Sequence, residues 1–172
     1  MNLDYKHLLP ETFSPNSRVW VYQSSRMFML SEALEIEALV NKFSTEWRSH
    51  GAEVNAYCNL FFGQFLVFIA DESDTTVSGC STDSSVRFVK QLGEQFKVDF
   101  FNRTTLAFVI KDKIQLLPMN QLQYAADHQF INGDTPYFNN LVQTMEQLEQ
   151  NWIIHVKDSW LAKRITVNVN GE

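Results

Sequence analysis

A short polar segment, residues 78–85, holds the residues of this chain that are best suited to chemistry. It reads SGCSTDSS, seven small or polar residues and one thiol, and it precedes a strongly amphipathic helical pattern. The start of a helix carries N–H groups without intrahelical acceptors and the positive end of the peptide dipole. Such a position suits bound anions and cysteines with a lowered pKa. The segment therefore predicts either an anion site or a reactive thiol.

The anion interpretation assigns the ligand contacts to the N–H groups of residues 81–84. The candidate ligand-binding residues are then Cys80, Ser81, Thr82, Asp83 and Ser84, with Arg87 and Arg103 as counter-charges. An ordinary helix cap uses the same residue types, with Ser81 or Thr82 as the cap and Asp83 complementing the dipole. Because capping explains these residues without any ligand, we favour the structural interpretation.

The alternative makes Cys80 the nucleophile of a thiol-dependent enzyme. An acyl-transfer reaction also needs a base beside the thiol. The candidate bases His50, His128 and His155 are all far from Cys80 in sequence. We therefore commit to no catalytic residue.

Metal sites are disfavoured by the spacing of the possible ligands. Cys58 and Cys80 are too far apart for a zinc pair, and the histidines are isolated. The acidic run over residues 71–74 lacks the spacing and the glycine of an EF-hand. We predict no metal and no cofactor.

Charge and composition limit the partners and the location. The net charge is −6 and the basic residues are scattered, which argues against nucleic acid. The longest apolar run, Phe65 to Ala70, is far too short to span a bilayer, and residues 1–10 contain no apolar signal-peptide core. Two cysteines do not make a disulfide framework. We expect a cytoplasmic protein with free thiols and no membrane association.

Hydrophobic periodicity predicts an α+β fold. In order, the predicted elements are a strand over 18–23, a helix from Ser31 to a stop at Gly51, strands over 54–62 and 65–70 joined by Gly63-Gln64, a helix carrying Val86, Val89, Leu92 and Phe96, and a strand over 106–110. The order β-α-β-β-α-β is that of a ferredoxin-like sandwich. Gly93 interrupts the second helical pattern, and close packing on a neighbour would explain it.

We divide the chain into a loosely ordered lead-in (1–17), a ferredoxin-like core (18–110) and a C-terminal α/β extension (111–172). In the extension, Lys111-Asp112 predicts a hairpin turn, and a capping box predicts a helix over Met145 to Asn151. Residues 135–142 fit a strand or a helix, and we choose the strand.

The end of the extension offers two weaker signals. His155, Asp158 and Ser159 supply the residue types of a catalytic triad, but a triad is defined by geometry rather than by proximity in sequence. Trp152 and Trp160 are expected in the core or in an aromatic patch that faces a partner.

Four segments resemble, in series, an uncharacterised family of small bacterial proteins that often carry the automatic label "ABC transporter ATPase". They are residues 78–88 (SGCSTDSSVRF), 101–103 (FNR), 138–142 (FNNLV) and 158–160 (DSW). The resemblance covers Arg18 to Trp160 and implies no established activity. An ATPase of that kind needs G-x-x-x-x-G-K-[ST] to hold the phosphates, and none of the six glycines begins such a run. We therefore reject ATP hydrolysis.

A second resemblance concerns the C-terminal third of the chain. Leu122, Ile131, Asp134-Thr135, Tyr137-Phe138 and Trp152 occur in an order similar to the helix-turn-strand part of GYF-type peptide-binding modules. The Gly-Tyr-Phe residues that define that family are missing. This resemblance favours interaction over catalysis.

These observations predict a non-enzymatic cytoplasmic domain that binds a protein partner or a small anionic ligand. The alternative is a thiol-dependent enzyme that uses Cys80. A closed pocket at the start of the second helix would favour the small ligand, whereas a flat aromatic patch around Trp152 and Trp160 would favour a protein.

Overall fold

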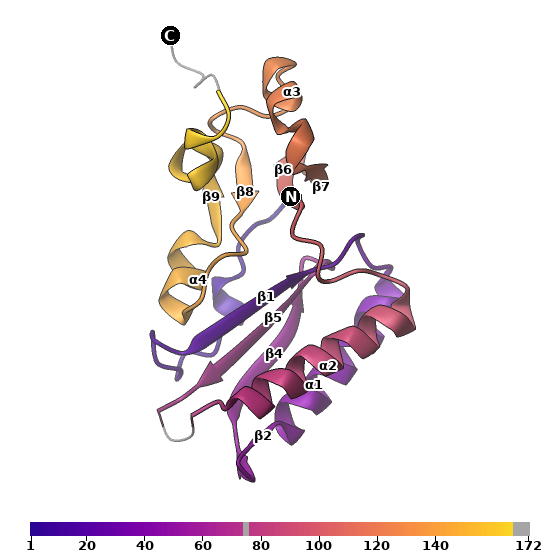
Figure 1. Ribbon diagram of the computed structural model, residues 1–172, viewed down its shortest axis with the longest axis vertical. Helices are drawn as coiled ribbons and strands as arrows, with labels where there is room; N and C mark the ends of the chain where they lie inside the picture. The colour runs from indigo at the N-terminus through magenta and orange to yellow at the C-terminus, as the bar shows by residue number, and fades with distance from the viewer. Residues whose placement is uncertain (74–75, 167–172) are drawn as a thin grey trace. The chain divides into compact units, whose positions relative to one another are not determined.

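The computed structural model describes residues 1–73 and 76–166, and their contacts divide the chain into two compact units. The larger unit contains residues 4–102 and 142–149, and the smaller unit contains residues 1–3, 103–141 and 150 onward. Figure 1 shows the order of the elements along the chain. Four short 3-10 helices accompany them, at Lys6–Leu8, Met119–Gln121, Val156–Asp158 and Trp160–Lys163.

The larger unit is built on a three-stranded antiparallel sheet. Its order is β1 (Arg18–Gln23), β5 (Phe65–Asp71) and β4 (Asn55–Phe61). Because β5 lies between them, β1 and β4 run parallel to each other, as in a split β-α-β unit. The two long helices of this unit are α1 (Leu30–Glu46) and α2 (Gly79–Phe96).

One core joins both helices to one face of this sheet. It contains Ile36 and Val40 of α1, Phe68 of β5, and Val89 and Leu92 of α2, all almost fully buried. These residues recur at helical spacing on α1 and α2, which is why each helix turns one apolar side to the sheet. All seven residues of β5 are buried, so the apolar run at 65–70 is a central strand covered on both faces, as its composition predicted.

The ferredoxin-like strand order is not confirmed, because the strand expected to complete the first sheet pairs elsewhere. β6 (Thr105–Ile110) belongs to a separate four-stranded sheet whose order is β7-β6-β8-β9. The reason is local. Lys111 and Asp112 adopt φ of 50° and 58°, which makes a tight turn and pairs β6 with β7 (Lys113–Pro118) next to it in the chain.

The edge of the first sheet is instead met by residues 143–145. Arg18 and Thr144 form an antiparallel bridge, the Val19 N–H donates to the carbonyl of Gln143 over 2.9 Å, and the Met145 N–H donates to that of Ser17 over 2.9 Å. A segment from late in the sequence therefore occupies the position that the element order assigned to residues 106–110.

Two turns differ from their predicted form. α1 ends at Glu46, and His50 and Gly51, at φ of 51° and 83°, form the turn between β2 (Arg48–Ser49) and β3 (Ala52–Glu53) rather than a helix stop. A two-residue turn with positive φ at both positions suits a hairpin, and the sequence pattern mistook it for a C-cap.

The connection between β4 and β5 is one residue longer than predicted. Phe61 pairs with Phe65, so the loop is Phe62-Gly63-Gln64 rather than Gly63-Gln64. Phe62 adopts φ of 54° and Gly63 φ of 62°.

The end of α2 explains Gly93. Lys97 adopts the left-handed conformation, with φ of 54°, and the Val98 N–H donates to the Gly93 carbonyl over 2.9 Å. A Cβ at position 93 would stand 2.9 Å from the Val98 carbonyl oxygen. The predicted close packing is confirmed, and the neighbour is the chain that leaves the same helix.

The smaller unit packs α3 (Leu122–Asp127) against its sheet, which also contains β8 (Pro136–Phe138) and β9 (Ile153–His155). The predicted strand within 135–142 is therefore present at Pro136–Phe138, and the predicted helix is α4 (Met145–Asn151). No helix in the described part of the chain is both long and apolar enough to cross a bilayer.

Candidate functional site

The start of α2 lies earlier than the sequence predicted, and the amides of Ser81 and Thr82 already have partners. Ser78, not Ser81 or Thr82, is the N-cap: its Oγ accepts from the Ser81 N–H over 3.3 Å. The Thr82 N–H donates to the Ser78 carbonyl over 3.0 Å. Residues 83 and 84 lie further inside the helix, where amides bond within it. The predicted amide contacts to an anion therefore fall one turn too far along.

The hydroxyl groups of this segment tie α2 to the strand and helix end beside it. Ser81 is buried, its Oγ donates to the Arg48 carbonyl over 2.9 Å, and its own carbonyl accepts from the Trp47 indole N–H over 3.0 Å. Ser78 is held in the same way, because its N–H donates to the Ser49 Oγ over 3.1 Å. These contacts give the polar residues a structural role.

The remaining predicted site residues, except Arg103, also lie on α2. Cys80, Asp83 and Arg87 are exposed on α2, while Ser84 donates its hydroxyl to the Ser81 carbonyl. Arg103 is exposed and belongs to the smaller unit. Six of the seven predicted residues thus lie on one helical segment of α2, and Arg103 lies in the other unit.

No base is found at the Cys80 thiol among the residues that the structure describes. The imidazoles of His128 and His155 instead contact the Tyr124 carbonyl at 2.9 Å and Asp158 at 3.7 Å. The possible triad of His155, Asp158 and Ser159 does not form either. The Ser159 hydroxyl donates to the Val156 carbonyl over 2.8 Å instead.

The described residues also contain no cluster of three potential metal ligands. In the acidic run at 71–74, Asp71 is buried in β5 and accepts from the Ser73 hydroxyl over 2.6 Å. That hydrogen bond is the main cause that lowers the pKa of Asp71. Asp74 lies outside the described residues. The part of this run that can be described acts as a turn.

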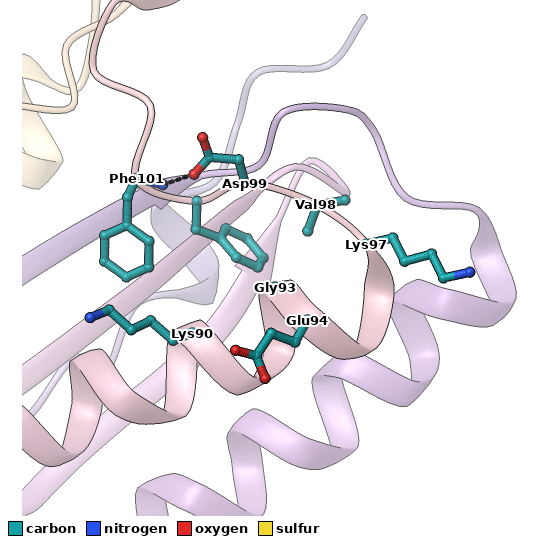
Figure 2. Close-up of a pocket in the computed structure, with 8 residues that line it drawn as sticks. Lys90, Gly93, Glu94, Lys97, Val98, Asp99 and Phe101 are labelled. Atoms are coloured by element: carbon teal, nitrogen blue, oxygen red, sulfur yellow. Dashed lines mark hydrogen bonds between the residues drawn. The ribbon is translucent and has the colours of Figure 1, made fainter.

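An open pocket of about 420 Å³ lies at the other end of α2 (Figure 2). Lys90 and Lys97 stand at opposite ends of it, and Glu94 and Asp99 also line it. Its charges are therefore balanced, so Coulomb attraction does not select an anion. The Phe101 ring is partly exposed there, and its N–H donates to the Asp99 carboxylate over 2.7 Å.

Four large apolar side chains close together in sequence are exposed at the start of α1. We name this group the Met–Leu surface, and it consists of Met27, Met29, Leu30 and Leu34, whose exposed fractions are 50%, 66%, 77% and 60%. Leu30 and Leu34 are one helical turn apart and so lie on the same side of α1. Isolated exposed leucines are ordinary, whereas a contiguous group of large apolar side chains marks an interaction site.

A salt bridge fixes the backbone that carries this surface. Both terminal nitrogens of Arg26 donate to the Glu32 carboxylate over 2.8 Å, and one of them also donates to the Phe96 carbonyl over 2.9 Å. Glu32 in turn accepts from the Met29 N–H over 2.9 Å. We call Arg26 and Glu32 the clamp. Its hydrogen bonds, led by that from Arg26, lower the pKa of Glu32 to about 2.

Phe28 anchors the same segment from the other side. Its ring is buried, 6.0 Å from the rings of Phe96 and Phe100, and its N–H donates to the Gly63 carbonyl over 2.8 Å. The chain therefore alternates, with Phe28 in the core and Met27 and Met29 in solvent. The two methionines are therefore exposed on a backbone that hydrogen bonds hold in place.

Sequence reasoning missed the Met–Leu surface because it treated apolar residues as core. A signal was present: Leu34 falls nearly opposite Ile36 when the helix is drawn at 3.6 residues per turn, and Leu30 lies one turn before Leu34. An apolar residue opposite the buried stripe has no place in the core.

Comparisons with known proteins bring no further assignment. A scan against protein-family models found no match, and searches of curated proteins and of solved structures found none either.

Proposed function

We propose that this chain is a non-enzymatic protein-interaction domain and that the Met–Leu surface is its contact surface. The observation that carries the proposal is that four large apolar side chains are exposed on and beside a segment that a bidentate salt bridge, the clamp, holds in place. Apolar surface left in water is unfavourable, so a rigid scaffold that maintains it is best explained by a partner that covers it.

The contacts of the other candidate sites favour this function over a small anionic ligand. The amides of Ser81 and Thr82 are used inside the helix cap, and the pocket beside Phe101 carries balanced charges. Composition and charge, as argued from the sequence, support a cytoplasmic location and a partner other than nucleic acid.

Site-specific photo-crosslinking tests the proposal. A photo-reactive phenylalanine analogue is placed at Leu34 and, as the control, at Lys42, which is exposed on the same helix. In an extract of the source cells, we expect a discrete adduct from position 34 that disappears when Leu30→Ser is added, and none from position 42. Equal adducts from both positions, or none from position 34, contradict the proposal.

Alkylation separates this function from the thiol-dependent enzyme. Iodoacetamide should modify Cys80, which is exposed, and leave Cys58 unmodified, because burial raises the pKa of the Cys58 thiol and blocks access. The crosslinked adduct at position 34 should persist in the alkylated protein. Its loss would instead favour a role for Cys80 in binding or catalysis.

A further inference from the structure

We infer that the partner presents an amphipathic helix whose apolar stripe covers the Met–Leu surface and whose flanking residues are lysine or arginine. This inference rests on the proposed function and names the chemistry of the partner.

The shape of the surface favours a helix. Leu30 and Leu34 form a short ridge of the i, i+4 type along α1, and such ridges pack into the grooves of another helix. Met27 and Met29, which are also exposed, precede Leu30 in the chain. Methionine side chains adapt to irregular surfaces, so they accommodate the side chains of an apolar stripe without a preformed pocket.

The charges beside the surface favour a basic helix. Glu35 and Glu37 follow Leu34 on α1, and Glu37 stands at a spacing of seven from Leu30, on the same side of the helix. Glu35 accepts from the neutral amide of Gln95 over 2.8 Å, so this contact leaves its charge uncompensated. The only basic residue of the clamp, Arg26, is already matched by Glu32. Two carboxylates, Glu35 and Glu37, therefore follow the exposed leucines on α1, and they would attract a basic partner.

The same charges argue against two other occupants. A second copy of this chain would bring its own Glu35 and Glu37 against those of the first, and like charges repel. A cytoplasmic bilayer surface is anionic and would be repelled in the same way. Opposite charge on the partner removes both penalties and speeds association.

Two synthetic peptides test the inference on the full chain. Both have the same length and the same leucine pattern at helical spacing, and their other positions are lysine in one peptide and glutamate in the other. Methyl NMR titration should shift the signals of Met27, Met29, Leu30 and Leu34, with the Leu/Lys peptide bound about tenfold more tightly at low salt.

Matched variants locate the interaction. Leu30→Ser with Leu34→Ser should weaken the Leu/Lys peptide about tenfold or more. Glu37→Lys should also weaken it, whereas Glu94→Lys, the same charge change on α2, should leave it unchanged. A Glu94→Lys effect equal to that of Glu37→Lys would reduce the attraction to one of overall charge and overturn the inference.

The remaining outcomes separate this inference from the function on which it rests. Equal binding of both peptides, or of neither, while the adduct at position 34 persists, overturns the basic helix and leaves the interaction domain standing. Binding to phosphatidylcholine–phosphatidylserine vesicles, or self-association, that depends on Leu30 and Leu34 also overturns it. Without an adduct at position 34, the proposed function itself fails.

Discussion

The starts of α1 and α2 satisfy their backbone N–H groups with different kinds of residue. At α2, Ser78 caps the helix from outside, and the serines and the indole of Trp47 bond to one another and to the neighbouring backbone. At α1, no hydroxyl caps the helix. Glu32 reaches back from inside it to the Met29 N–H while holding Arg26. One start is polar and closed, and the other is apolar and exposed.

The difference shows that residue type and use are separate properties. The polar segment at α2 has the composition of a binding site, yet its donors and acceptors serve the fold. The Met–Leu surface has the composition of a core, yet its side chains are in water. What decides the matter in each case is whether the groups have partners within the chain.

The largest effect on stability is expected at the start of α2, for Trp47→Ala. Trp47 is almost fully buried, with its ring 5.4 Å from that of Phe43 and its N–H on the Ser81 carbonyl. We expect a loss of about 3–5 kcal/mol of unfolding free energy, measured by urea denaturation. Trp47→Phe keeps most of the ring contacts and should lose about 1 kcal/mol. If Trp47→Ala loses less than the expected range of about 3–5 kcal/mol, the indole does not hold α2.

The next test removes the cap itself. Ser78→Ala deletes the acceptor of the Ser81 N–H and should lower the unfolding free energy by about 1 kcal/mol. Ser78→Asp restores an acceptor and adds a charge that suits the helix dipole, so it should recover most of the loss. If alanine and aspartate behave alike in thermal unfolding, the cap is not what stabilises this start.

The clamp at α1 gives a smaller, pH-dependent effect, because Arg26 is exposed and Glu32 is only half-buried. The pKa of Glu32 falls from 4.5 to about 2 on folding, so the native state favours the carboxylate. Its contribution is complete above the unfolded pKa and is lost as pH falls from 4.5 toward about 2. The difference in urea midpoint between wild type and Glu32→Gln should therefore shrink over that range. A difference that stays constant with pH would contradict the clamp.

The smallest effect on stability is expected for the exposed leucines at the start of α1. Leu30→Ser with Leu34→Ser should change the unfolding free energy by no more than about 0.5 kcal/mol, because both side chains are already in solvent. Ile36→Ala, on the buried side of the same helix, should lose about 2–5 kcal/mol in the same urea experiment. A large loss in the double variant would place these leucines in the core.

Periodicity predicted most elements of the fold because it reflects which side of each element is buried. The positions of β1, β5 and the buried side of α2 follow from residues such as Val89 and Leu92. Strand partners do not follow from periodicity. β6 reads as a strand in either sheet, and only the Lys111–Asp112 turn and the bridge at Thr144 decide between them.

The candidate site was less predictable, because the availability of a donor depends on contacts distant in sequence. Ser81 lies 33 positions from the Arg48 carbonyl that accepts its hydroxyl. The cap also lies one turn earlier, at Ser78 instead of Ser81, and this shift is enough to place the predicted amides inside the helix. The Met–Leu surface was easier to predict, since Leu34 stands nearly opposite Ile36 on a helical drawing.

The clamp has a consequence for how this chain can diverge. The residues that hold the start of α1, Arg26 and Glu32, are not those that face outward from it. Replacement of Met27, Met29, Leu30 or Leu34 therefore leaves the scaffold intact. Selection can alter what this face recognises while the rest of the sequence is conserved, so variation confined to these positions would record a history of changing binding specificity.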